Sequence, residues 1–495
     1  MNKYIFYLIL LVLCSTGFYL KFQKNHQDIP MRCDEFGYMN LAKVFDENIA
    51  YVEHTKRPYM PQLLDTLRKS SITEEEIDWM VVPHAYYVVP NTNKIVNQYP
   101  PATSWLLSLF PLEHRRMLFP LIAVFLFLLF PFLSQLNIKQ KKVNWTDCAL
   151  VLFVFIMSVS VPFITEFARI NSLAFTFGLL LTAGMLVERN TILAFFLIAL
   201  TINFRPVNML MLIPIITFIP ISTWLREKNY TAFITAILKY VGLLILAVLP
   251  YFVYVYLLFG NPFMSTYSSY DTTANNNLFE NMLFYFNINR HWFIFHLVVV
   301  GVLLTLSLLK ITSYTFFFQS LFFPIFNYVF FIYHDIHLDY YPYASSIILL
   351  GICIAQIQKI PYKINHTKIA LVFSLLIGIT IFCDGLYTSY NNPVRSFEDA
   401  KKDYSCLCNY DIVWGELLTG SCEYVCGNNG YKYSPTSPRA RKIAMKFLHD
   451  HHYKQAILLN DNLVDKQTVI EEVSSINLKY HIVFDNIVKE ILVLE

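Results

Sequence analysis

Charged residues are scarce in this sequence. Only 15% of the 495 residues are Asp, Glu, Lys or Arg, whereas 56% are hydrophobic. A soluble domain carries about 25% charged residues, so the shortage excludes an ordinary soluble domain and indicates a polytopic membrane protein. The sequence also lacks internal repeats and low-complexity tracts. The net charge of +3 is informative only through its distribution along the chain.

Signals for cleavage of the N-terminal segment are also lacking. Residues 4–20, YIFYLILLVLCSTGFYL, are long for the apolar core of a signal peptide, and no Ala-x-Ala-like cleavage site follows them. Cys14 follows Leu13 rather than a small residue, which argues against a lipoprotein cleavage site. We therefore expect residues 4–20 to be a retained first span.

Apolar runs of roughly spanning length recur along the chain and predict about 11 transmembrane helices. Residues 191–204 form the weakest predicted span, and Pro206 is expected to separate it from the next one. The predicted spans are 4–20, 116–136, 147–165, 171–187, 191–204, 206–224, 234–259, 292–310, 314–333, 341–358 and 368–388.

Lysine and arginine indicate how these spans are oriented. With a cytoplasmic N-terminus, the short inner loops carry Lys and Arg, as the positive-inside rule requires. The first loop (21–115) and the C-terminal tail then lie outside. The Asn-x-Ser/Thr sequons begin at Asn144, Asn229 and Asn365, and all fall on inner loops. We expect an integral membrane protein of the bacterial inner membrane.

The tail predicts a small extracytoplasmic α/β domain over residues 391–495, after a transmembrane domain over residues 1–390. PRARKIAMKFLHDHH predicts a helix after Pro438, and YKQAILLN, KYHIVFD and KEILVLE predict strands.

Cysteines in the tail favour disulfides, because disulfides form in an oxidising compartment. Zinc is the alternative, but the C-x-C and C-x3-C spacings depart from the usual ligand pairs. The pairing of Cys33 is left open. The tail cysteines are Cys406, Cys408, Cys422 and Cys426.

The first loop begins with an acidic pair in the stretch CDEFGYMNLAKVF. Asp34 is placed to cap a helix, with Glu35 in the first turn. Tyr38, Leu41, Val44 and Phe45 recur at helical spacing and predict an apolar face that could lie on the membrane surface. Considered alone, the stretch is best interpreted as a capped amphipathic helix.

Two more segments carry candidate residues on the outer side. In NQYPPATSWLLSLF (97–110), a Pro-Pro pair precedes an apolar run, and its simple interpretation is a helix start. In ITEFARINSLAF, Glu166, Arg169 and Asn171 stand at the outer mouth of two spans. Polar residues at membrane depth are functional candidates, although residues at the mouth can simply be solvated.

In this order, the three segments resemble the membrane glycosyltransferases of the GT-C fold, in particular protein O-mannosyltransferases and aminoarabinose–lipid A transferases. The family motifs are D-E-x-x-Y-x-x-x-A, P-P-L-x-x-W and an A-R segment that opens a later span. The resemblance covers roughly residues 1–390. The matching residues are Asp34, Glu35, Tyr38 and Ala42; Pro100, Pro101 and Trp105; and Ala168, Arg169 and Phe177.

The resemblance implies transfer of a sugar from a polyprenyl-phosphate donor to a glycolipid, polysaccharide or protein acceptor, with inversion. Asp34 is then the expected general base, and Glu35 orients the acceptor, holds a cation or caps the helix. Arg169 and Arg205 are expected to bind the donor phosphate, since Arg grips phosphate in a bidentate manner. The expected substrate-binding residues are Tyr38, Gln98, Tyr99, Asn171 and Tyr341. The expected partners also include membrane lipids, but no nucleic acid.

Some positions depart from the family pattern. Gln98 and Tyr99 stand where aminoarabinose transferases often have Glu and Lys, and Asn171 or Ser172 stands where an Asp is common. We therefore assign no metal ligand and leave a divalent metal open. HDIHLD (334–339) has residue types that bind metals, but a short polar loop is the favoured interpretation.

Two other functions compete with this hypothesis. A transporter or flippase of lipid-linked sugars would show inverted repeats and charges near mid-membrane. Neither is clear in the sequence, and the large first loop fits a flippase poorly. A non-catalytic scaffold whose tail binds a partner is the third hypothesis.

Overall fold

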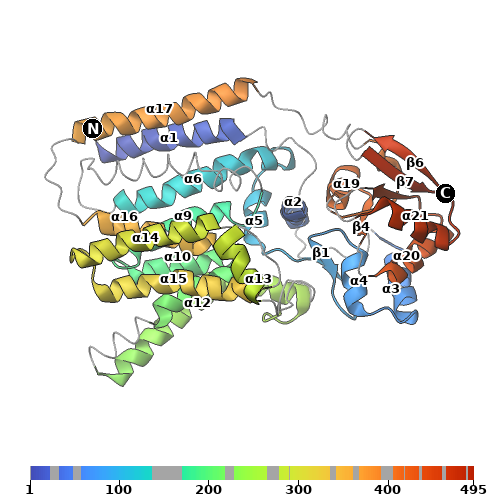
Figure 1. The fold of residues 1–495 in the computed structure, drawn as a ribbon, viewed down its shortest axis with the longest axis horizontal. Coiled ribbons are helices and arrows are strands. Elements are labelled where there is room, and N and C mark those ends of the chain that lie inside the picture. Colours follow the sequence, from blue (N-terminus) through green and yellow to red (C-terminus); the bar gives the residue numbers. More distant parts are fainter. Residues whose placement is uncertain are drawn as a thin grey trace. The chain divides into compact units, whose positions relative to one another are not determined.

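The computed structural model describes most of the chain, as a bundle of helices and a unit that mixes helices with sheets (Figure 1). The described residues are 2–22, 33–47, 57–136, 170–217, 228–264, 278–288, 290–334, 342–359, 367–391, 405–416, 418–433, 437–459, 464–485 and 489–495.

Contacts divide the chain into two compact units, here called the helical unit and the mixed unit. The helical unit comprises Met1–Gln23, Arg116–Val253 and Asp271–Asn392. The mixed unit comprises Lys24–Arg115, Tyr254–Tyr270 and Pro393–Glu495, so the first loop and the tail pack in one unit. The predicted division into domains at residue 390 stays a prediction.

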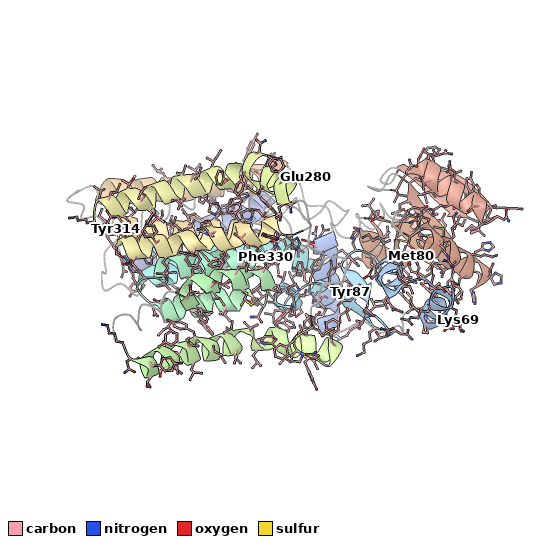
Figure 2. All side chains as sticks on the ribbon, turned by 60° about the horizontal axis from the view of Figure 1, so that its bottom comes forward. Lys69, Met80, Tyr87, Glu280, Tyr314 and Phe330 are labelled. Atoms are coloured by element: carbon pink, nitrogen blue, oxygen red, sulfur yellow. A yellow bond between two sulfur atoms is a disulfide. The ribbon has the colours of Figure 1, made fainter. Side chains whose placement is uncertain are left out.

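Apolar helices form the helical unit. Some of their apolar side chains are buried against neighbouring helices, and others are exposed on the surface of the unit. Figure 2 shows Tyr314 and Phe330 on one of these helices, α15. The elements are α1 (Lys3–Phe22), α6 (Arg115–Leu136), α9 (Ala174–Leu186), α10 (Thr191–Thr201), η4 (Pro206–Leu212), α12 (Tyr230–Phe259), α13 (Leu278–Leu283), η6 (Phe284–Ile288), α14 (Arg290–Leu308), α15 (Tyr314–Ile332), α16 (Tyr343–Ile357) and α17 (Thr367–Asn391). The first residue of α6, Arg115, and the end of α12 from Tyr254 belong to the mixed unit.

Where the structure describes them, the predicted spans fall on these helical elements. The span 147–165 and residues 218–224 of the span 206–224 lie outside the described residues. Within the described residues, three helices are long and apolar enough to cross a membrane: Lys3–Lys21, Tyr230–Phe259 and Tyr314–Ile332. A pair bent by 68° would make a fourth. The protein therefore has several apolar spans, and the count of about 11 stays a prediction.

Close helix packing in this unit depends on glycine. An added Cβ at Gly385 of α17 would lie 2.1 Å from the Gly17 carbonyl oxygen of α1. Likewise, a Cβ at Gly351 of α16 would lie 2.2 Å from the Leu181 oxygen of α9. Small residues let helix backbones approach in this way inside a membrane. In Figure 1, α1 and α17 accordingly run side by side.

The break expected at Pro206 is present. Arg205 is extended, with φ −153° and ψ 103°, and the 3-10 helix η4 begins at Pro206. Just before it, the buried Asn203 amide donates to the Ala247 oxygen at 2.8 Å and accepts from the Tyr251 nitrogen at 3.1 Å. These two groups stand four residues apart in α12, with Pro250 between them. A proline inside a helix disturbs the backbone hydrogen bonds around it. Asn203 therefore supplies partners for both groups in apolar surroundings.

Replacing Asn203 by Ala is expected to lower the free energy of unfolding on the order of 1–3 kcal/mol, because two backbone groups lose a partner. Thermal unfolding of the full chain in detergent measures the loss. Adding Pro250→Ala lets α12 pair Tyr251 with Ala247 directly, so the double variant is expected to lose less than the sum of the single variants. Additive losses would contradict the bridging role.

In the mixed unit, short helices and a hairpin of the first loop accompany a sheet of the tail. The first-loop elements are α2 (Cys33–Asp46), α3 (Met60–Lys69), α4 (Glu74–Met80), β1 (Tyr86–Val88), β2 (Ile95–Asn97), α5 (Ala102–Ser108) and η3 (Leu112–His114). The tail elements are η7 (Leu407–Asn409), β3 (Ile412–Gly415), α19 (Thr419–Cys426), β4 (Asn429–Lys432), α20 (Pro438–Asp450), β5 (Gln455–Leu459), α21 (Lys466–Ser475), β6 (Tyr480–Asp485) and β7 (Lys489–Leu494).

The tail sheet has the strand order β4-β3-β5-β7-β6. β3 pairs parallel with β4 and β5, while β7 pairs antiparallel with β5 and β6. β3 and β5 are buried throughout, as is typical of central parallel strands. The helix and the three strands predicted for the tail are confirmed as α20, β5, β6 and β7, whereas β3, β4, α19 and α21 were not predicted.

Cysteine pairing in the tail is settled for one pair. Cys408 and Cys426 form a disulfide, which confirms the preference for disulfides at these positions. It also removes two of the four thiolates that the zinc interpretation required. The Cys33 side chain lies outside the described part of the structure, so its pairing stays open.

Helix α2 corrects one expectation. The helix is present, but its apolar side chains Tyr38, Leu41 and Val44 are buried within the protein. The prediction that this face could lie on the membrane surface was wrong, because α5 and α19 pack against α2 instead.

Candidate active site

Asp34 lies in the first turn of α2 and is held by a tyrosine from the first loop. The Tyr99 hydroxyl donates to Asp34 Oδ1 at 2.7 Å. The Tyr38 ring, one turn after Asp34, stacks on the Tyr99 ring with the centroids 4.9 Å apart. Residues four apart share one helix face, so Tyr99 contacts both from the same side. The structure thus brings together three predicted site residues.

Gly37 makes this close packing feasible. A Cβ at this position would lie 2.4 Å from the Tyr99 ring and 2.7 Å from the Ala85 methyl group. Any larger residue at 37 would push Tyr99 away from α2. The glycine in the motif is therefore required by the tyrosine that holds the carboxylate.

Asn97 fixes the loop that carries Tyr99, and the sequence reasoning missed it. The Asn97 amide donates to the Gly37 oxygen at 2.9 Å, and its side-chain oxygen accepts from the Tyr99 nitrogen at 2.8 Å. From α5, the buried Ser104 hydroxyl donates to the Tyr38 oxygen at 2.9 Å. The only sequence signal was the position of Asn97 just before the Pro-Pro motif.

The two carboxylates of the motif have different surroundings. Asp34 is partly exposed, whereas Glu35 is buried, with 6% exposed. Gln98, which replaces the usual acidic residue, is also buried, and its Oε1 has no hydrogen-bond partner among the residues that the structure describes. Asp34 is therefore the more accessible acid of the pair.

The far end of α2 is anchored separately. Arg115 donates to Asp46 at 2.5 Å and to the Phe110 oxygen at 2.8 Å. The Trp105 ring packs on Phe45, with the centroids 5.7 Å apart. Trp105 of the second motif thus supports α2 by packing, and α2 is held along its whole length.

The site residues that the sequence predicts in the helical unit have different outcomes. Arg169 and Tyr341 lie outside the described residues. Asn171 is buried, and its side-chain oxygen accepts from the nitrogens of Leu173 and Ala174 at 2.8 and 3.0 Å. Asn171 therefore stabilises the start of α9, and a substrate contact for it stays a prediction.

Arg205 lies beside a buried polar cluster that sequence reasoning did not find. Its guanidinium lies 5.8 Å from the centroid of the Tyr343 ring, a cation–π contact. The Tyr343 hydroxyl contacts Asn208 at 3.3 Å and Thr176 at 3.1 Å. The sequence predicts Tyr341 as a substrate-binding residue, whereas Tyr343, two residues later, is the tyrosine placed in this cluster.

A metal site is not apparent in the described residues, which include no group of three or more His, Cys, Asp or Glu side chains placed to hold an ion. Asp335, His337 and Asp339 of the HDIHLD segment lie outside them.

Comparison with known proteins identifies solved structures with a similar fold. No family model and no curated protein matches the sequence. Among solved structures, ArnT from Cupriavidus metallidurans bound to undecaprenyl phosphate matches with a TM-score of 0.51 and 11% identity, over 99% of this chain and 97% of that chain. ArnT in the apo state matches over the same shares, with a TM-score of 0.49 and 10% identity.

This chain shares the fold of ArnT. ArnT is an aminoarabinose transferase of the GT-C fold, so the predicted resemblance is confirmed at the level of the fold. The ArnT fold and the apolar helices together indicate an integral membrane protein. At 11% identity, the likeness to ArnT assigns no role to any single residue.

Outside the part of the mixed unit that surrounds Asp34, an unusual acid links the first loop to the tail. Glu416 follows β3, is buried, and lies 3.2 Å from His84 Nε2. Burial raises the pKa of Glu416 from 4.5 to about 7, although the charges of Lys432 and Arg441 partly oppose this. The folded protein therefore binds a proton here that the unfolded chain has released between pH 4.5 and 7.

Stability of the mixed unit is expected to fall as the pH rises from about 4.5 to about 7, and this carboxyl contributes no further change above that range. The free energy of unfolding that is lost through the Glu416 carboxyl is at most about 3 kcal/mol. Glu416→Gln should remove this pH dependence of stability, whereas Glu471→Gln, at an exposed position, should keep it. Hydrogen exchange of the β3 amides in the full chain at pH 5 and pH 8 measures the change. An unchanged pH dependence in Glu416→Gln would refute this origin.

Proposed function

We propose that this chain is a membrane glycosyltransferase that moves one sugar from a polyprenyl-phosphate donor to an acceptor. The main support is the hydrogen bond that the Tyr99 hydroxyl donates to Asp34 Oδ1 at 2.7 Å. The chain that contains it shares the ArnT fold over 99% of its length. The donor class is supported by the ArnT structure, which is bound to undecaprenyl phosphate.

In the proposed reaction, Asp34 acts as general base. It accepts the proton of an acceptor hydroxyl while the hydroxyl oxygen attacks the anomeric carbon of the sugar. The bond between that carbon and the phosphate oxygen breaks, and the lipid phosphate leaves with the electron pair. Attack from the opposite side inverts the anomeric carbon. Tyr99 fixes one carboxylate oxygen, which orients Asp34 before the acceptor arrives.

Arginine neutralises the departing phosphate in this proposal. Arg205 is one candidate, because its guanidinium lies beside the buried polar cluster, 5.8 Å from the centre of the Tyr343 ring. Arg169 is the other, from the sequence resemblance alone. Arg is suited to this role because its guanidinium donates two parallel hydrogen bonds to phosphate oxygens.

The proposed location is a bacterial inner membrane, with a cytoplasmic N-terminus and the tail outside. The Cys408–Cys426 disulfide supports an oxidising compartment for the tail. The acceptor class stays open among glycolipids, polysaccharides and proteins. Mass spectrometry of glycolipids and glycoproteins from cells with and without the gene would identify sugar and acceptor together.

Replacing Asp34 by Asn is expected to lower transfer by about 100-fold or more, because the amide accepts no proton and general-base catalysis contributes roughly 10²–10⁴-fold. Asp65→Asn is the matched control, since Asp65 is exposed and pairs with Lys69 on α3. Release of undecaprenyl phosphate from a sugar-loaded donor in membranes measures the rate. Near-full activity of Asp34→Asn would refute the proposed base.

Replacing Tyr99 by Phe keeps the ring on Gly37 and removes only the hydroxyl that binds Asp34. We expect kcat to fall roughly tenfold or more, with KM for the donor little changed, because a hydrogen bond to a charged group is worth about 1.5–3 kcal/mol. Since Tyr99 acts through Asp34, the double variant with Asp34→Asn should be no slower than Asp34→Asn alone. Multiplicative losses would show that Tyr99 acts independently.

A further inference from the structure

We propose that helix α19 of the tail positions helix α2, so that the tail sets the geometry of the carboxylate pair. The inference extends the proposed function, because Asp34 on α2 is its base. It concerns residues of the mixed unit alone. Three observations carry it: a close contact at the start of α2, a second contact two turns later, and the anchoring of α19 itself.

The first contact joins Phe36 and Gly420. A Cβ at Gly420 would lie 2.4 Å from Phe36 Cδ1 and 2.7 Å from its Cγ, so the ring lies directly on the α19 backbone. Phe36 is fully buried and also packs on Tyr86 of β1, with the centroids 5.8 Å apart. The ring therefore has little room to move, and Phe36 stands two residues after Asp34.

The second contact joins Lys43 and Tyr424. The Lys43 ammonium lies 3.8 Å from the centroid of the Tyr424 ring, within the range of a cation–π interaction. Lys43 is seven residues after Phe36 on α2, and Tyr424 is four residues after Gly420 on α19. Both spacings return to the same helix face, so the two contacts define one continuous interface between the helices.

Helix α19 is itself fixed at several points. Glu423 accepts from the buried Arg57 side chain at 2.6 Å and from the Gly430 nitrogen of β4 at 3.0 Å. The last residue of α19, Cys426, is bonded to Cys408, which precedes β3. Arg57 of the first loop, β4 and the disulfide thus hold α19, and α19 in turn contacts the face of α2 that carries Phe36.

A displacement of α19 would therefore move the first turn of α2. Tyr99 reaches Asp34 from β2 and α5, which are elements of the first loop, so such a displacement would disturb the 2.7 Å contact between them. A misplacement of about 1 Å can cost roughly 100-fold in rate.

The catalytic test is Gly420→Ala, which places a methyl group against the Phe36 ring. We expect kcat for sugar transfer to fall about tenfold or more, with KM for the donor little changed. Adding Phe36→Leu removes ring atoms from the clash and should restore much of the rate. Gly242→Ala is the matched control, because nothing lies within 4 Å of that position. Normal kcat in Gly420→Ala, or no recovery with Phe36→Leu, would overturn the proposal.

A second test is independent of catalysis. Purified full-length protein with Cys408→Ser and Cys426→Ser should exchange the amide hydrogens of residues 33–46 about tenfold faster or more, with α15 unchanged. Cys406→Ser is the control, because it leaves the disulfide intact. Unchanged exchange in α2 would overturn the positioning role even if transfer is normal. Faster exchange in α2 without sugar transfer by the wild type would instead refute the proposed function alone.

Discussion

The contact between Tyr99 and α2 is the constraint on which the rest of the candidate site depends. A carboxylate that accepts a proton must point in one direction, and the Tyr99 hydroxyl fixes one of its oxygens. The ring reaches that position only because residue 37 is glycine and Asn97 joins both chain segments. The motifs around Asp34 and around Pro-Pro are thus halves of one packed arrangement, which explains why they occur together.

Within the helical unit, the equivalent constraint is that backbone N–H and C=O groups in apolar surroundings need hydrogen-bond partners. Asn203 bonds to the backbone of α12 on both sides of Pro250, and Asn171 stabilises the first turn of α9. In the sequence, Asn171 is a functional candidate, because polar residues at membrane depth are rare. These contacts show a structural task for each asparagine. A phosphate-binding role for Arg205, whose guanidinium lies 5.8 Å from the centre of the Tyr343 ring, stays a proposal.

Sequence reasoning succeeded where the signal is local. Hydrophobic runs located the apolar helices that the structure describes, since such a helix is defined by its own composition. Strands β3 and β4 were missed because each has four residues and is recognisable only from its partners in the sheet. The contact of Tyr99 with Asp34 spans 65 positions, and Asn97 acts through backbone groups, so neither could be derived from local patterns. The burial of the α2 apolar face also depends on segments distant in sequence, which is why the membrane-surface interpretation failed.

The two acids of the pair differ in exposure because of their positions on the helix. Asp34 and Glu35 are adjacent, and neighbouring residues on a helix point about 100° apart. One therefore faces Tyr99 and retains exposure, while the other turns into the protein and is buried. Only Asp34 is accessible from outside the protein, so in the proposed reaction helix geometry decides which of the two acids an acceptor meets. Gln98 fits this division, because a neutral amide beside the site adds no second buried charge.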